Sequence, residues 1–274
     1  MEKHAMGARG LSSGAKETVK VLEEVQGEFE KEYANFLVEK RRLAEKFRER
    51  INGLWERRVA LANGDVEGKE KVEGFWSKAL QGHPQVDEHI EEWDEQVLEY
   101  LKDIDYSYTA PETGFTLTFT FNPNPYFTNP TLTKSYTIPG FFSDDESERM
   151  EVKKVEGSVI RWKEGKDVTV VQKKAGKKKR GRGGGKGRSR ASFFRFFRSV
   201  DVEEVMAQLT SPDDAEELLE ELQFDLTLAM AIKTQIIPNA VDWFTGKAFR
   251  KATGVEEDED DGEEAGGGEG VVNV

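Results

Sequence analysis

Carboxylate side chains gather at three places in the chain. They are Asp144, Asp145, Glu146 and Glu148; Glu216, Glu217, Glu220, Glu221 and Asp225; and Glu256, Glu257, Asp258, Glu259, Asp260 and Asp261, in a run that continues to Glu264. Carboxylates form charge-assisted hydrogen bonds with arginine and lysine, and they accelerate the encounter with basic partners. One exposed pair contributes only about 0–1 kcal/mol. These segments therefore indicate either a surface that binds a basic partner through many charges or an ordinary solvated surface.

A basic segment lies between residues 173 and 190. It holds ten lysines and arginines and no acid, whereas the whole chain of 274 residues has a net charge of -13, so that -13 minus 10 leaves -23 for the rest. This balance favours basic partners for the chain as a whole. The segment itself has three interpretations: a nuclear import signal at Lys177, Lys178, Lys179 and Arg180, a phosphate contact with nucleic acid, or a flexible solvated loop.

Residue types that would indicate catalysis or metal binding are absent or wrongly spaced. The chain has no cysteine, and its histidines, His4, His83 and His89, lack the spacing of metal ligands. Residues 181–187 are rich in glycine but do not form the Gly-x-x-x-x-Gly-Lys-Ser/Thr motif of a phosphate-binding loop, because Lys186 is followed by glycine. We therefore predict no enzymatic activity, no cofactor and no metal. We interpret His83, which precedes Pro84, as a surface residue in a turn.

The first element that must position these charges is a long helix predicted for residues 15–62. Good helix formers dominate this stretch, and no proline occurs before Pro84. Apolar residues recur at alternating steps of three and four, as in a coiled-coil seam. The principal seam residues are Leu22, Phe29, Tyr33, Phe36, Leu43, Phe47 and Leu54. A second copy of the same helix would cover this seam in a symmetric homodimer; the alternative is an ordinary core helix covered within one chain.

The residues after the long helix change period and indicate an antiparallel sheet. Residues 115–121 alternate apolar side chains with threonine, and residues 132–138 alternate again, which is typical of half-buried strands. Further strands are predicted at 104–108 and 157–171, giving about four in all. The basic segment would then form the tip of a hairpin beside this sheet.

Helices are predicted before and after the strands in the sequence. One covers residues 87–101, and an amphipathic one covers 213–232, with a short helix to follow from Ile236 through Phe244. The side chains expected to face inward on the second helix are Leu218, Leu219, Leu222, Leu226 and Met230. The glutamates of that helix and Asp225 are expected to point mainly away from the core.

Neither a membrane span nor a secretory leader is expected. No apolar run approaches the roughly 20 residues that cross a bilayer, and residues 1–11 have no apolar stretch of the kind found in signal peptides. The lack of cysteine also suits a reducing compartment. We therefore expect an intracellular protein.

Four motifs, in order, resemble the nucleosome assembly protein family. They are Asn124–Asn129 with Leu132–Lys134, Ile160–Val170, Ser192–Phe197 and Ile236–Gly246. The resemblance spans about residues 15–250 and lies nearer the classical members than the SET-type branch. Three features depart from the family pattern: Pro130, the arginines Arg195 and Arg198, and the short acidic tail.

The resemblance implies an α+β fold: a long N-terminal dimerisation helix, then an earmuff-like domain with a small antiparallel sheet, a protruding β-hairpin and C-terminal helices. The implied organisation is a disordered N-terminus (1–14), the dimerisation helix (15–62), a histone-binding domain (63–250) with the basic hairpin tip (173–190), and a disordered acidic tail (251–274). It also implies a histone chaperone that binds core histones, mediates nucleosome assembly, disassembly and histone transport, and uses importins to shuttle between cytoplasm and nucleus.

Two other functions fit the same residues. The dimer could be a coiled-coil adaptor for other basic proteins, or the basic hairpin could make the chain a nucleic-acid-binding protein. Binding to core histones, to non-histone partners or to naked nucleic acid separates the three hypotheses.

Overall fold

The computed structural model describes residues 11–109, 114–139, 141–142, 152–171 and 188–254. Its helices are α1 (Ser13–Ala62), α2 (Phe75–Gln81), α3 (Pro84–Asp87), α4 (Glu92–Leu98), the 3-10 helix η1 (Phe193–Phe197), α5 (Val202–Gln208), α6 (Pro212–Ala231), the π-helical turn η2 (Ile232–Ile236), α7 (Ala240–Phe244) and α8 (Lys247–Thr253). The strands are β1 (Leu101–Tyr108), β2 (Gly114–Phe121), β3 (Thr131–Thr137), β4 (Lys154–Gly157), β5 (Val170–Val171), β6 (Arg188–Ser189) and β7 (Val200–Asp201).

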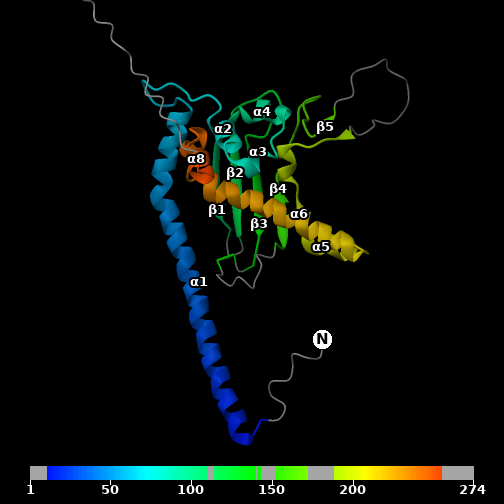
Figure 1. Cartoon of the computed structure of the whole chain (residues 1–274). Coiled ribbons are helices and arrows are strands. Elements are labelled where there is room, and N and C mark those ends of the chain that lie inside the picture. Colours follow the sequence, from blue (N-terminus) through cyan, green and yellow to red (C-terminus); the bar gives the residue numbers. More distant parts are fainter. Residues whose placement is uncertain (1–10, 110–113, 140, 143–151, 172–187, 255–274) are drawn as a thin grey trace, which may run out of the picture.

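Helix α1 is one uninterrupted rod of 50 residues, close to the predicted range. At 1.5 Å per residue it is about 75 Å long. The Ser12 side chain caps its first turn by accepting a hydrogen bond from the amide of Ala15. Its C-terminal half runs beside β1, and its N-terminal half extends well beyond the rest of the domain (Figure 1). Arg48, which pairs with Asp105, and Arg58, which donates to the carbonyl of Ile237, join the C-terminal half to the domain.

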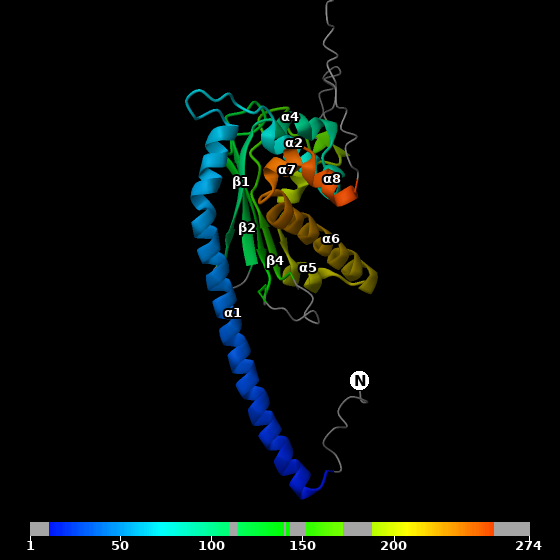
Figure 2. The ribbon, with the colours of Figure 1, turned by 60° about the vertical axis from the view of Figure 1, so that its left-hand side comes forward.

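Five strands form one antiparallel sheet in the order β1-β2-β3-β4-β7. The predicted alternation sorts the side chains of β2, because Phe115, Leu117, Phe119 and Phe121 are all buried while the intervening threonines are partly exposed. Helix α6 crosses one face of the sheet, and α1 runs along the edge formed by β1 (Figures 1 and 2). The α+β architecture expected from the sequence is therefore confirmed.

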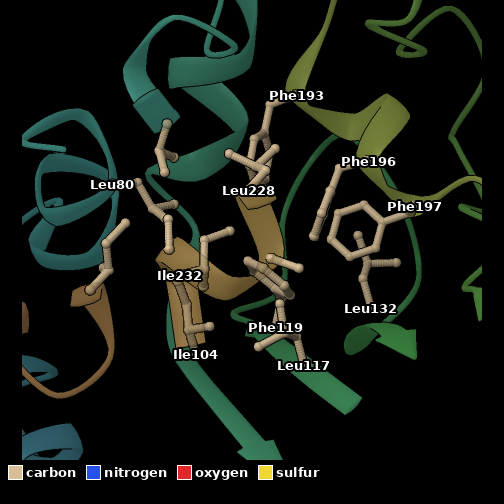
Figure 3. Close-up of a cluster of buried hydrophobic side chains, with 14 of the residues drawn as sticks. Leu80, Ile104, Leu117, Phe119, Leu132, Phe193, Phe196, Phe197, Leu228 and Ile232 are labelled. Carbon is tan, nitrogen blue, oxygen red and sulfur yellow. The ribbon is translucent and has the colours of Figure 1, made fainter. Parts of the chain in front are cut away.

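The core fills the space between the sheet, η1 and the C-terminal half of α6 (Figure 3). The η1 phenylalanines close one side of it, and the ring of Phe197 meets that of Phe119 edge to face at 5.2 Å. Asp94 of α4 fixes the start of η1 by accepting hydrogen bonds from the Ser192 hydroxyl at 2.6 Å and the Phe193 amide at 2.7 Å. Burial raises the pKa of Asp94, and these hydrogen bonds oppose the shift.

The strand predicted for residues 157–171 is wrong for most of its length. Only β4, which ends at Gly157, and the short β5 are strands, and between them the chain pairs with the turn at 124–129. Trp162 forms an isolated bridge with Phe127, and the Lys163 amide donates to the carbonyl of Tyr126 at 2.7 Å. Prolines at 123, 125 and 130 explain the difference, because proline cannot donate to a continuous ladder.

The helix predicted for residues 87–101 is too long, because only α4 lies within this range. The chain forms α3, breaks, forms α4 and already enters β1 at Leu101. Pro84 begins α3, and a reciprocal capping box between Glu91 and Asp94 begins α4. The later predicted helices correspond to α6 and α7, whereas α5 and α8 were not predicted. Helix α8 runs to Thr253, three residues into the predicted acidic tail.

Two side chains lie where the sequence did not place them. Leu219 was expected inward but is 49% exposed, because buried residues of α6 begin only at Leu222. His83 was expected on the surface but is buried, with Nε2 2.8 Å from Oε1 of Gln235 and its ring against Trp243. Phe75, Trp76 and Trp243 belong to the core.

Strands β5 and β6 pair antiparallel and form the base of the expected hairpin. Arg188 and Ser189, assigned to the hairpin tip from the sequence, lie in β6. The remaining tip residues through 187, including the predicted import signal at 177–180, lie outside the described residues. No helix in the described part of the chain is long and apolar enough to span a bilayer.

Lys233 is a lysine buried in the core. It lies in η2, and its ammonium is 4.8 Å from the ring centre of Tyr106, 5.0 Å from that of Tyr108, 5.5 Å from that of Phe115 and 5.4 Å from that of Phe141. Aromatic faces attract a cation and offset part of its lost hydration. Burial nevertheless lowers the pKa of Lys233 to about 8.

We expect Lys233→Met to raise the free energy of unfolding at pH 7, where the wild type must bury a cation. The folded lysine releases its proton near pH 8, while the unfolded lysine retains it to about 10.5. The unfolded state then binds more protons, so wild-type stability rises with pH in this window and the advantage of the variant shrinks. Urea unfolding at pH 7 and pH 10 measures both effects, with exposed Lys247→Met as the control. A constant difference between K233M and wild type would contradict the prediction.

Candidate acidic binding surface

Helix α5 and the N-terminal half of α6 form an acidic arm, defined here as residues 202–221. Between residues 200 and 232 the sequence holds ten acids and no lysine or arginine. Asp201 caps α5 by accepting from the Glu204 amide, and Ser211 caps α6 by accepting from the Asp213 amide, each at 3.2 Å. Acids in both first turns suit the positive ends of the helix dipoles. The arm projects beyond β4 (Figure 1).

Four of the five acids predicted on α6 are exposed on this arm. They are Glu216, Glu217, Glu220 and Glu221. Glu221 lies 3.4 Å from a guanidinium nitrogen of Arg198, and because both side chains are more than half exposed, the pair contributes little. The arm also carries Glu203, Glu204, Asp213 and Asp214, which the sequence-based prediction missed. The absence of basic residues from 200 to 232 is the signal that could have found them.

Asp225, the fifth predicted acid, faces the sheet rather than solvent. Its carboxylate accepts from the Tyr136 hydroxyl at 2.7 Å and lies 2.9 Å from Nζ of Lys134. The Lys134 side chain is 2% exposed, and its Nζ also donates to the carbonyl of Arg198 at 3.1 Å. Burial lowers the pKa of Lys134, and the charge of Asp225 opposes that shift. Asp225 therefore anchors α6 to β3, which corrects the expectation that it points away from the core.

The described part of the chain leaves the seam of α1 uncovered. Leu22, Phe29, Phe36, Leu43, Phe47 and Leu54 are between 45% and 69% exposed. Tyr33 stands between two seam rings, with its centre 6.0 Å from those of both Phe29 and Phe36. The opposite face of the helix carries Arg48, whose guanidinium pairs with Asp105 on β1 and lies over Trp55. The helix therefore has one face for its own domain and a second, apolar face that its own domain leaves open.

The other predicted sites lie outside the described residues. These are the loop acids Asp144, Asp145, Glu146 and Glu148, the import signal Lys177, Lys178, Lys179 and Arg180, and the tail acids Glu256, Glu257, Asp258, Glu259, Asp260 and Asp261. In the described ranges, no group of three or more histidine, aspartate or glutamate side chains is placed to hold a metal ion.

Comparisons with known proteins agree with one another. A family described as nucleosome assembly protein (NAP) matches residues 17–247. Nucleosome assembly protein 1;2 of Oryza sativa subsp. indica is 32% identical, over 94% of this chain and 75% of the relative. Nucleosome assembly protein 1;3 of Nicotiana tabacum is 34% identical, over 90% of this chain and 69% of the relative. The structure resembles nucleosome assembly protein 1 from Plasmodium knowlesi with a TM-score of 0.67 and 31% identity, covering 86% of this chain and 98% of that one.

We expect Asp225→Ala to lower the free energy of unfolding by about 3 kcal/mol, because it leaves the buried ammonium of Lys134 without its carboxylate. The double variant D225A/K134M should recover much of this loss, since no unpaired charge remains. Urea unfolding measures both, and Glu220→Ala, an exposed acid on the same helix, should change stability by less than about 0.5 kcal/mol. If D225A behaved like E220A, the anchoring role would be wrong.

Proposed function

The chain belongs to the nucleosome assembly protein family, and on that premise we propose that it is a histone chaperone that binds core histones and delivers them during nucleosome assembly and disassembly. Membership also confirms that the chain is not an enzyme, because nucleosome assembly proteins are chaperones. The observation that carries the proposal is the acidic arm, which presents carboxylates from two helices and contains no lysine or arginine.

The arm suits a strongly basic cargo for electrostatic reasons. Its glutamates are exposed, so each contact with lysine or arginine is worth little by itself and many must act together. Their summed field attracts a basic protein and repels the phosphates of nucleic acid. A chaperone must hold histones without holding DNA, and an unmixed acidic surface meets that requirement. Salt screens exposed charges, so affinity should fall as ionic strength rises.

We propose further that two copies join along the α1 seam to form a homodimer. Six large apolar side chains at heptad spacing stand exposed on a helix about 75 Å long. Covering them removes apolar surface from water, which is the main favourable term in most protein association. A second copy supplies the same stripe on a helix of equal length, so the contact closes under twofold symmetry.

The segments outside the described residues complete the proposal. The loop acids at 144–148 and the tail acids at 256–261 would add auxiliary charge contacts with the cargo. The lysine-rich residues 177–180 would be read by importins, so that the protein shuttles between cytoplasm and nucleus. The antiparallel pairing of β5 with β6, the two strands that flank the basic segment in the sequence, supports the assignment of this segment to a hairpin.

A charge-neutralised arm tests the chaperone function. We expect E216Q/E217Q/E220Q to bind core-histone pairs roughly tenfold more weakly than the wild type near physiological salt, because three exposed charge contacts are lost. Its affinity should also depend less steeply on salt concentration. The matched control is E67Q/E70Q/E73Q, which neutralises three exposed acids in the loop between α1 and α2. Titration of each histone pair, with mass determination of the complex, measures the effect.

Contrary binding results would either favour one of the two alternative functions or remove the arm from the mechanism. Tight binding of the wild type to naked nucleic acid, with none to histones, would favour a nucleic-acid-binding protein. Binding only to non-histone basic proteins would favour an adaptor. Equal affinities of the two triple variants would remove the arm from the mechanism.

A seam variant tests the dimer. We expect L43E/F47E to be monomeric at micromolar concentration, because the variant would place four charged side chains in the apolar contact between the two copies. Glutamate is a good helix former, so α1 itself should persist. The control R42E/K46E alters the exposed residue that precedes each seam position. Light scattering reports the mass; a monomeric wild type, or a dimeric L43E/F47E, would disprove the proposed interface.

A further inference from the structure

Phe224 is an exposed aromatic residue where the acidic arm joins the domain. It lies on α6, its side chain is 54% exposed, and its ring meets that of His89 edge to face at 4.8 Å. The phenylalanine side chain is wholly apolar, and the half of its ring that stays in water contributes nothing to the hydrophobic stabilisation of the fold. The ring nevertheless packs against His89 in the loop between α3 and α4.

A hollow of about 370 Å³ opens beside this ring. Its apolar lining comes from Phe193 and Phe196 of η1 and from Leu228, one turn after Phe224 on α6. These three side chains are buried, so the floor of the hollow is the domain core. The hollow is therefore a rigid recess with an apolar floor and Phe224 as one wall.

Charged side chains surround the recess. Four acids line it: Glu88 and Glu221, which are exposed, and Glu91 and Asp225, which are partly buried. Two arginines also line it, and both have partners: Arg198 pairs with Glu221, and Nε of Arg195 donates to the carbonyl of Arg190 at 2.7 Å.

The carboxylates of α6 approach Phe224 in helical register. Glu221, Glu220 and Glu217 precede it by three, four and seven residues, which are the spacings that share a face of a helix. A cationic segment lying along α6 would therefore meet several carboxylates before it reached the ring. An apolar centre with a charged rim is also the usual anatomy of a protein interface, in which a few aromatic anchors supply most of the binding energy.

We infer that the recess beside Phe224 accepts an apolar side chain of the cargo whose neighbours in the cargo are lysine or arginine. The inference rests on the proposed chaperone function and adds to it: the recess distinguishes a folded basic protein that presents an apolar residue from a chain that carries positive charge alone. The carboxylates attract both kinds of partner, and Phe224 retains only the first.

The test compares two ligands and four proteins. The ligands are a folded core-histone pair and polyarginine of similar charge. The proteins are full-length wild type, F224A, the ring-retaining F224Y, and F249A, which removes another exposed phenylalanine on α8. Affinities are measured at several salt concentrations, and thermal unfolding verifies that each variant is folded.

We expect F224A to bind the histone pair about tenfold more weakly than the wild type at every salt concentration, with an unchanged salt dependence, because an apolar contact is not screened. F224Y and F249A should bind the histone pair like the wild type, and all four proteins should bind polyarginine alike.

Two results would overturn the inference while leaving the chaperone function in place: F224A binding histones as the wild type does, or F224A losing affinity for polyarginine to the same degree. A wild-type protein that bound no histone pair would instead refute the proposed function, and the inference with it.

Discussion

The position of the acidic arm depends on one buried ammonium. Lys134 projects from β3 into the core side of the sheet, where Asp225 of α6 and the carbonyl of Arg198 receive it. A lysine that is almost wholly buried must have such partners, because an unpaired charge away from water is very costly. The pair adds little net stability compared with well-packed apolar side chains. It does select one placement of α6, since any other would separate the charges.

The two proposed binding surfaces are built from different elements. The seam belongs to α1, whose other face is joined to β1 by Arg48 and Asp105. The arm belongs to α5 and α6 and projects beyond β4, whereas α1 lies beside β1 at the other edge of the sheet (Figure 1). The sheet therefore works as a rigid spacer between an apolar association surface and an acidic cargo surface.

Burial and the charge of Asp105 raise the pKa of Asp103 to about 6 in the contact between α1 and β1, because the carboxylate there is poorly hydrated.

Periodicity predicted the parts of the fold that depend on local pattern. Helix α1 and strands β2 and β3 lie where it placed them, because each buries one regular stripe. It failed where distant residues decide the structure. The segment 158–169 pairs with the proline-rich turn instead of forming a strand, and Leu219 is exposed because it lies on the projecting arm. Asp225 looked like its exposed neighbours because its partner lies 91 residues away. A signal existed, since Lys134 shares the strand face of Leu132 and Tyr136 and so had to be buried with them.

No residue of the seam belongs to the arm, and the sheet separates the two. Mutations can therefore accumulate in one surface without altering the other. In the proposed dimer, a duplicated copy that kept the seam could still pair with its paralogue while its arm adapted to a different cargo. A heterodimer of two such paralogues would carry two different cargo surfaces. Cargo specificity could then change through the exchange of subunits as well as through mutations within one sequence.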